Sequence, residues 1–81
     1  QPVTVPNIDI NMNAAFQNCK NLCQNMTIPQ AITNKYRISQ TFKDCNGFDS
    51  TIAQINVPSH FYGTDAVTYW DQTARACINW Y

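Results

Sequence analysis

The chain has 81 residues, enough for one domain, 1–81, and too few for a second compact core. Five acidic and five basic residues cancel to a formal net charge of zero, which argues against nucleic-acid binding through phosphates. Hydrophobic residues make up 44%, too much for a disordered chain, but no run of them is long enough to span a membrane.

Residues 3–10 are expected to form an extended strand, because apolar residues alternate along them. Pro6 cannot donate a hydrogen bond to a neighbouring strand, so this strand should lie at the edge of a sheet or be broken in two. Because an edge strand can pair with a second chain, we count such pairing among the expected partners.

From Met12 to Met26 the apolar residues recur at spacings of three and four, which is typical of an amphipathic helix. Asn11 is expected to cap the start of this helix, and Pro29 should prevent it from continuing. Its apolar stripe consists of Met12, Ala15, Phe16, Cys19, Leu22, Cys23 and Met26.

Residues 36–57 are predicted to form a β-hairpin, because Asn46-Gly47 is a strong signal for a two-residue turn with positive φ at both positions. With that turn, Ile38 faces Ile55, and polar and apolar side chains separate onto opposite faces. The apolar face, which we expect to be buried, comprises Tyr36, Ile38, Phe42, Ala53, Ile55 and Val57.

The C-terminal segment, 64–81, fits two interpretations. Its β-branched and aromatic residues favour a pair of strands turning near Gln72, whereas its polar residues recur with the period of a helix. We predict the helix, capped by Thr64, with Gln72 and Arg75 in solvent. Its buried side should carry Tyr69, Trp70, Cys77 and Trp80.

These elements follow the order strand, helix, strand, strand, helix, and no internal repeat is visible. The predicted fold class is α+β, with two amphipathic helices packed on one face of a small antiparallel-rich sheet and two disulfides. This is the split βαβ, ferredoxin-like order without the last strand.

Four cysteines in a chain of this length predict a disulfide framework and an oxidising compartment. Asn25-Met26-Thr27 is a sequon for N-glycosylation at Asn25, and the first residue, Gln1, is not Met; both observations favour a secreted, extracellular protein. A zinc site is the rival interpretation, but four-cysteine zinc modules usually contain two close pairs, and only Cys19 and Cys23 are close. We therefore assign no metal ligand.

Cys19 and Cys23 lie on one face of the predicted helix, and a regular helix cannot bring two such sulfurs to bonding distance. Each is expected to reach Cys45 or Cys77 instead. Two connectivities remain open: 19–45 with 23–77, or 19–77 with 23–45.

Enzymatic chemistry has few candidate residues in this chain. Glu is absent and His60 is the only histidine, so a small hydrolase of ribonuclease type would have to pair His60 with an aspartate. The chain contains only two glycines and lacks a phosphate-binding loop motif, so we expect no cofactor and assign no catalytic residue. The candidate binding residues are the loop side chains His60, Phe61 and Tyr62.

The order of elements, the neutral polar composition and the cysteines of Cys19-x3-Cys23 resemble small secreted fungal proteins of the KP6 killer-toxin type and plant-pathogen effectors of similar fold. The resemblance covers most of the chain as an order of elements and includes no residue motif. It implies helices on an antiparallel sheet, secretion, and a toxin or effector role. A second stretch, from Tyr69 to Cys77, looks like the second strand pair of Kunitz inhibitors, and Cys19-x3-Cys23 looks like their terminal helix, in reversed chain order.

The functional prediction is a secreted, non-enzymatic interaction protein of toxin or effector type that recognises an extracellular or host protein or glycan through its surface. One alternative is a small secreted hydrolase that uses His60. The other is a protease inhibitor that presents the loop 56–63.

Overall fold

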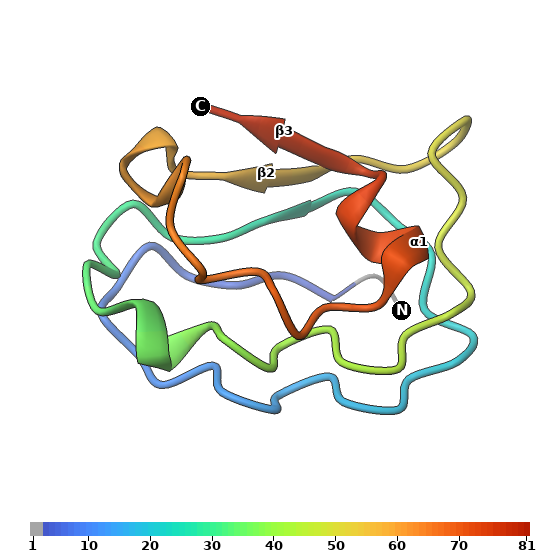
Figure 1. Cartoon of the computed structure of the whole chain (residues 1–81), viewed down its shortest axis with the longest axis horizontal. Helices are drawn as coiled ribbons and strands as arrows, with labels where there is room; N and C mark the ends of the chain where they lie inside the picture. Colours follow the sequence, from blue (N-terminus) through green and yellow to red (C-terminus); the bar gives the residue numbers. More distant parts are fainter. Residues whose placement is uncertain (1–2) are drawn as a thin grey trace.

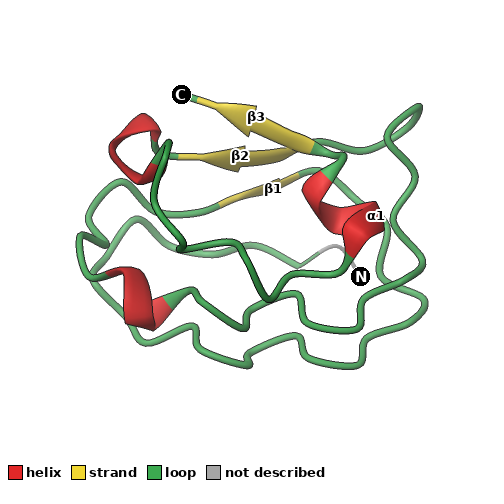
Figure 2. Ribbon diagram, viewed as in Figure 1, coloured by secondary structure: helices red, strands yellow, loops and turns green. Residues whose placement is uncertain are grey.

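In the computed structural model, which describes residues 3–81, the chain winds into stacked coils that share one narrow sheet (Figure 1). The sheet consists of β1 (Met26–Thr27), β2 (Ile55–Val57) and β3 (Ile78–Trp80). The described residues contain one short α-helix, α1 (Gln72–Arg75), and two 3-10 helices, Lys35–Arg37 and Ser59–Phe61. Most of the remaining chain forms loops and turns (Figure 2).

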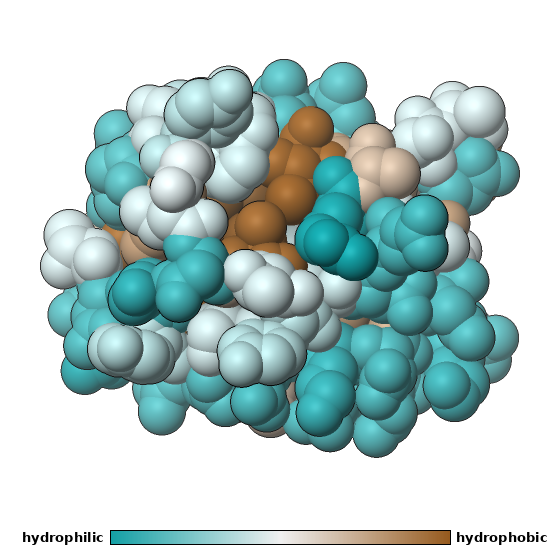
Figure 3. Space-filling model, viewed as in Figure 1, coloured by the Kyte–Doolittle hydropathy of each residue, from teal (hydrophilic) through white to brown (hydrophobic). Residues whose placement is uncertain are grey.

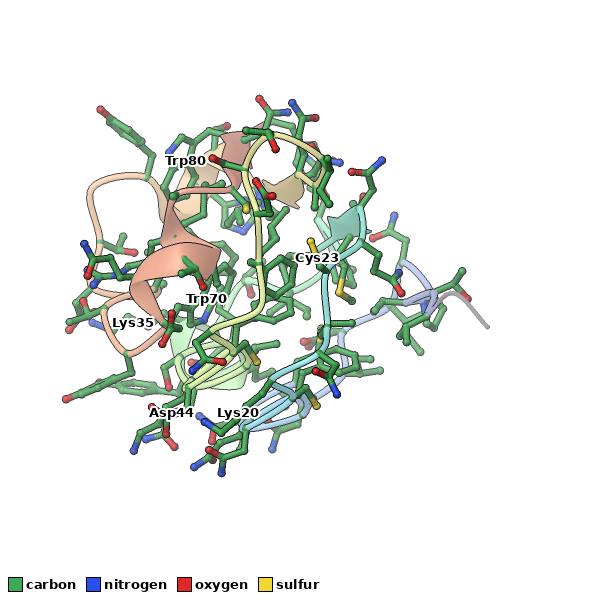
Figure 4. The ribbon with its side chains drawn as sticks, turned by 90° about the vertical axis from the view of Figure 1, so that its right-hand side faces the viewer. Lys20, Cys23, Lys35, Asp44, Trp70 and Trp80 are labelled. Atoms are coloured by element: carbon green, nitrogen blue, oxygen red, sulfur yellow. The ribbon has the colours of Figure 1, made fainter. Side chains whose placement is uncertain are left out.

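The three strands are parallel, in the order β1-β2-β3, with Met26 opposite Ile55 and Ile55 opposite Ile78. Because parallel neighbours cannot be joined by a tight turn, the chain makes a full circuit between one strand and the next. We call these circuits the first coil (3–25), the second coil (26–54) and the third coil (55–77). Figure 4 shows them edge-on as layers, with the third coil on the left and the first on the right.

Backbone hydrogen bonds also join the coils on the side opposite the sheet, so the stack is held at two places around each circuit. Three of them connect the first coil to the second, and one connects the third coil to the second. The donor and acceptor pairs are Met12 N to Arg37 O at 2.8 Å, Phe16 N to Thr41 O at 3.0 Å, Asn18 N to Lys43 O at 2.9 Å, and Asp71 N to Phe42 O at 3.1 Å.

The stacked coils reveal an internal repeat, which corrects the expectation that the sequence has none. Phe16 and Cys19 recur 26 residues later as Phe42 and Cys45. Four segments, which we call rows, all read apolar, then Thr or Asn, then apolar; the first runs beside the sheet and the other three belong to it: Val3-Thr4-Val5, Met26-Thr27-Ile28, Ile55-Asn56-Val57 and Ile78-Asn79-Trp80. The repeat is hard to see because its period changes, from 26 residues at the phenylalanines to 29 between β1 and β2 and 23 between β2 and β3.

Phe42, in the second coil, is the centre of the core. Its ring stacks on Phe16 of the first coil at 5.7 Å and meets Trp70 of the third coil edge-on at 4.7 Å. The indole of Trp70 donates a hydrogen bond to the Ile38 carbonyl at 2.8 Å, so burial leaves its N–H satisfied. The aromatic contacts therefore tie all three coils together.

The predicted helix over 12–26 is wrong. Ala14 and Asn18 have φ values of 60° and 65°, which a right-handed helix does not allow. Apart from Ala15, which is exposed, the residues of the predicted apolar stripe are buried or half-buried, because the coil turns these positions inward. Spacings of three and four therefore occur here without a helix.

The predicted helix over 64–81 is also wrong, since only Gln72–Arg75 is α-helical and β3 follows it. Trp70 and Cys77 are buried, and Gln72 and Arg75 are exposed, as predicted. Tyr69 is 60% exposed, contrary to the prediction.

The predicted hairpin over 36–57 does not form, and β2 pairs in parallel with β1 and β3 instead. The sheet is thus parallel, where an antiparallel-rich one was expected. On the apolar face predicted for the hairpin, Tyr36 is 67% exposed, whereas the other members are buried: Ile38, Phe42, Ala53, Ile55 and Val57.

Gly47 is needed for close approach of two coils, and its φ is not in the positive region. A Cβ added at Gly47 would lie 2.1 Å from the backbone oxygen of Lys20 in the first coil. The glycine thus lets the second coil pass over the first. This contact takes the place of the turn that Asn46-Gly47 predicted.

We expect Gly47→Ala to destabilise the protein by ~1–3 kcal/mol, because the added methyl group forces the two coils apart. Chemical denaturation of the variant and the parent measures the difference. Gly63→Ala is the matched control, since Gly63 has a φ of +79° but open space around its Cβ position. It should cost only the ~1 kcal/mol of left-handed backbone strain. Equal midpoints for Gly47→Ala and the parent would contradict this coil packing.

Candidate binding pocket

The three residues predicted to bind a partner do not form one surface. Phe61 is 2% exposed and belongs to the core, whereas Tyr62 is 70% exposed and meets Trp80 edge-on at 5.3 Å. His60 Nε2 lies 2.8 Å from the Ile32 carbonyl oxygen, so its ring links the third coil to the second. His60 and Tyr62 are exposed, as a binding role requires, but Phe61 between them is not.

No hydrogen bond or ion pair joins His60 to an aspartate within residues 3–81. The two ion pairs of this part of the chain are Lys35–Asp65 and Arg37–Asp9. One ring nitrogen of His60 is already engaged with a backbone carbonyl, which is a structural role. The acid–base pair that a hydrolase of ribonuclease type needs is not assembled around this histidine.

The loop 56–63, considered for protease inhibition, is anchored in the sheet at its start. It begins within β2, the central strand, and continues directly into the 3-10 helix Ser59–Phe61. Val57 and Pro58 are buried. Asn56 and Val57 lie between two other strands and have no free backbone to offer to a protease, whereas Ser59, His60, Tyr62 and Gly63 are exposed.

The four cysteines are free thiols, which corrects the prediction of two disulfides. Cys19 and Cys23 were expected to share one face of a helix, but 12–26 is not a helix. Neither of the two predicted connectivities is formed. Cys45 Sγ donates to the Phe16 carbonyl at 2.8 Å, and Cys77 Sγ donates to the Thr73 carbonyl at 3.4 Å. Burial raises the pKa of both of these thiols. No group of three or more His, Cys, Asp or Glu side chains suited to a metal ion occurs in residues 3–81.

We expect the native protein to have the mass of the fully reduced chain and to react with a thiol reagent in two phases. Cys19 and Cys23 are half-buried and should react first, whereas Cys45 and Cys77 are buried with raised pKa values and should react only on unfolding. Mass spectrometry of the alkylated peptides measures the order. A mass lower by four hydrogens would instead show that two disulfides are formed and would contradict the free thiols.

A pocket of about 140 Å³ opens on the side of the stack, between the second coil and the third. The second coil contributes the 3-10 helix Lys35–Arg37, whose N-cap Asn34 accepts a hydrogen bond from the Tyr36 N–H at 2.9 Å. The third coil contributes the turn that begins at Asp65. The pocket is lined by Lys35, Tyr36, Ser39, Asp65, Ala66 and Tyr69.

Two exposed tyrosines flank this pocket. Tyr36 and Tyr69 are 67% and 60% exposed, although both lie next to deeply buried parts of the fold. Ala66, which also lines the pocket, is a small residue that is 1% exposed. Exposed aromatic side chains that line a pocket are accessible to a ligand.

Polar groups complete the pocket. Lys35 Nζ and Asp65 Oδ1 lie 2.7 Å apart, and this charge-assisted hydrogen bond raises the pKa of Lys35 and lowers that of Asp65. Lys35 Nζ is also 5.4 Å from the centroid of the Tyr36 ring, within the range of a cation–π contact. Ser39 Oγ accepts a hydrogen bond from Asn13 Nδ2 at 2.8 Å, which fixes the position of its hydroxyl.

A second cavity, of about 190 Å³, separates residues 3–5 from the segment 25–27. The carboxamide of Gln24 bridges this gap by accepting from Val3 N at 3.0 Å and donating to Val3 O at 2.8 Å. The predicted glycosylation residue, Asn25, lies at this cavity and accepts from Gln54 N at 2.9 Å. Residues 3–10, predicted as an edge strand, contain no assigned strand, and 3–5 run beside β1 outside the three-stranded sheet (Figure 1).

The chain matches no family model, and no match to it was found among curated proteins or solved structures, so its own residues must carry any functional inference. Nothing in these comparisons bears on the resemblance to KP6-type proteins, and the coils do not have the order of elements on which that resemblance is based. No helix among residues 3–81 is long and apolar enough to cross a membrane.

Sequence reasoning missed both tyrosines of the pocket, because it assigned Tyr36 and Tyr69 to buried faces. The sequence identifies these two tyrosines as surface residues only indirectly, through the coil repeat. Once the coil repeat is recognised, Ile38 and Trp70 occupy the inward positions. Their neighbours Tyr36 and Tyr69 are then left at the surface of adjacent coils.

Proposed function

We propose that this protein is a non-enzymatic recognition module of toxin or effector type that binds a neutral glycan of an extracellular or host partner. The observation that carries the proposal is the pocket in which two exposed tyrosines flank a Lys35–Asp65 pair. A surface pocket of this kind supports the expectation from the sequence that the protein acts by recognising a partner through its surface.

The chemistry of the pocket suits a sugar ring better than other ligands. A pyranose has an apolar face that packs on an aromatic ring and a rim of hydroxyl groups that need both donors and acceptors. The lysine and the aspartate supply both, and because their charges compensate each other, a charged ligand gains little. The volume is far below the ~300–1,000 Å³ of pockets for drug-sized ligands, which favours a single sugar unit.

Secretion remains part of the proposal, but it is now supported by fewer observations than the sequence analysis used. The free thiols no longer argue for an oxidising compartment. The sequon Asn25-Met26-Thr27 still favours an extracellular location, and Asn25 is exposed.

We expect Tyr36→Ala and Tyr69→Ala each to weaken glycan binding at least about tenfold, or ~1.4 kcal/mol, because each removes one aromatic wall of the pocket. A glycan array identifies the ligand, and calorimetry measures the affinities. Tyr62→Ala is the matched control, since Tyr62 is equally exposed but lies outside the pocket. If all three variants bound like the parent, or if no neutral glycan bound, the proposal would be wrong.

His60 distinguishes binding from the hydrolase alternative. We expect His60→Ala to change biological activity by no more than a few-fold, because its ring contacts a backbone carbonyl and not an acid–base partner. Losing a general base usually costs about 10²–10⁴ in rate. A loss of that size with an unchanged melting temperature would instead support the hydrolase.

A further inference from the structure

The two outer rows, 3–5 beside the sheet and β3 at its edge, are less buried than the two rows between them. In the two inner rows, the inward-facing side chains Met26, Ile28, Ile55 and Val57 are at most 4% exposed. The same positions in the two outer rows are only half-buried: Val3, Val5, Ile78 and Trp80. Since the rows have the same pattern of residues, the difference comes from their place in the stack.

The same contrast occurs away from the sheet. Phe16 and Leu22 of the first coil are half-buried, whereas their equivalents in the second coil, Phe42 and Phe48, are buried. Each coil thus covers its neighbour, and the first coil lacks a neighbour on one side. We call this apolar surface the head; it consists of Val3, Val5, Ile10, Phe16 and Leu22.

The opposite end of the stack carries a matching apolar surface. Figure 3 looks onto the third coil and shows a hydrophobic area near the middle of the face, surrounded by hydrophilic residues. The half-buried apolar residues at this end are Val67, Ile78 and Trp80, and we call them the tail. Repeat proteins normally close such ends with polar capping repeats, and neither described end has one.

The free edge of β3 adds backbone groups to the tail. Cys77 O accepts from Ile55 N at 2.8 Å and Tyr81 N donates to Val57 O at 2.9 Å, so these two residues turn toward β2. Alternate residues of a strand point their backbone groups to opposite sides, so Ile78 and Trp80 turn theirs away from β2. An edge of this kind is a template for one more parallel strand.

We propose that a second copy of this chain stacks its head on the tail, with its residues 3–5 lying parallel to β3. The coil-on-coil contact within the chain is the model for this contact, because the same row pattern already packs in this way between β1, β2 and β3. Thr4 of the second copy then lies opposite Asn79. It extends the side-chain ladder in which Asn79 Nδ2 donates to Asn56 Oδ1 at 2.8 Å and Asn56 Nδ2 donates to Thr27 Oγ1 at 3.2 Å.

A second copy fits this surface better than an unrelated partner. The zero net charge of the chain removes long-range repulsion between copies. The head includes residues 3–5, which run beside β1 and have the same residue pattern as the rows of the sheet, as a strand joining β3 would need. Head and tail are different surfaces, so the contact is heterologous and each added copy exposes a new tail.

Sedimentation equilibrium of the full chain tests the proposal. We expect the average mass to rise with concentration from the 9.2 kDa monomer, without stopping at a dimer. Ile78→Lys in the tail and Leu22→Lys in the head should each hold the chain as a monomer, because a charge then faces the apolar end of another copy. Val67→Lys is a second tail variant, in case Ile78→Lys does not fold by circular dichroism.

Ile52→Lys is the matched control, because Ile52 is 70% exposed and lies outside both ends. It should associate like the parent. Mixing the head variant with the tail variant should give a one-to-one dimer and nothing larger, since each supplies the surface that the other lacks. A parent that stays monomeric at its highest soluble concentration, a tail variant that dimerises alone, or an equal effect of Ile52→Lys would each overturn the proposal.

Discussion

Contact between successive coils is the constraint on which the structure depends. The strands contain only two or three residues each, so no row of the sheet is stable by itself. Each row gains its hydrogen bonds and its apolar cover from the rows beside it, and only the second coil has a neighbour on both sides. Phe42, between Phe16 and Trp70, occupies the place where all three coils meet.

Burial could be predicted from the sequence more reliably than topology. Ile38, Phe42 and Ile55 are apolar in a pattern that would turn them inward in a hairpin as well as in a coil. The direction of the strands was missed because the repeat changes its period, so the rows are not evenly spaced in the sequence. Gly47 added to the error, since a glycine needed for close approach to Lys20 reads as a turn residue when the neighbouring coil is unknown.

The pocket could not be predicted for a related reason. Tyr36 and Tyr69 are large and largely apolar, and amphipathic patterns assign such residues to the inside. In the coils, the inward position beside Tyr69 is taken by Trp70, whose indole reaches the Ile38 carbonyl. The pocket joins two segments about 30 residues apart in the sequence, and only the stacking of their coils brings Lys35 to Asp65.

The pocket and the ends of the stack are different surfaces of the protein. The pocket opens between the second and third coils, and its six lining residues include none of the half-buried residues of the head or the tail. Copies stacked as proposed would carry their pockets at regular intervals along one assembly. A site for one sugar unit binds weakly by itself, because few atoms make contact. Copies that stack through their ends would engage several units of a repeating glycan at once, so the avidity of the assembly would exceed the affinity of its single sites.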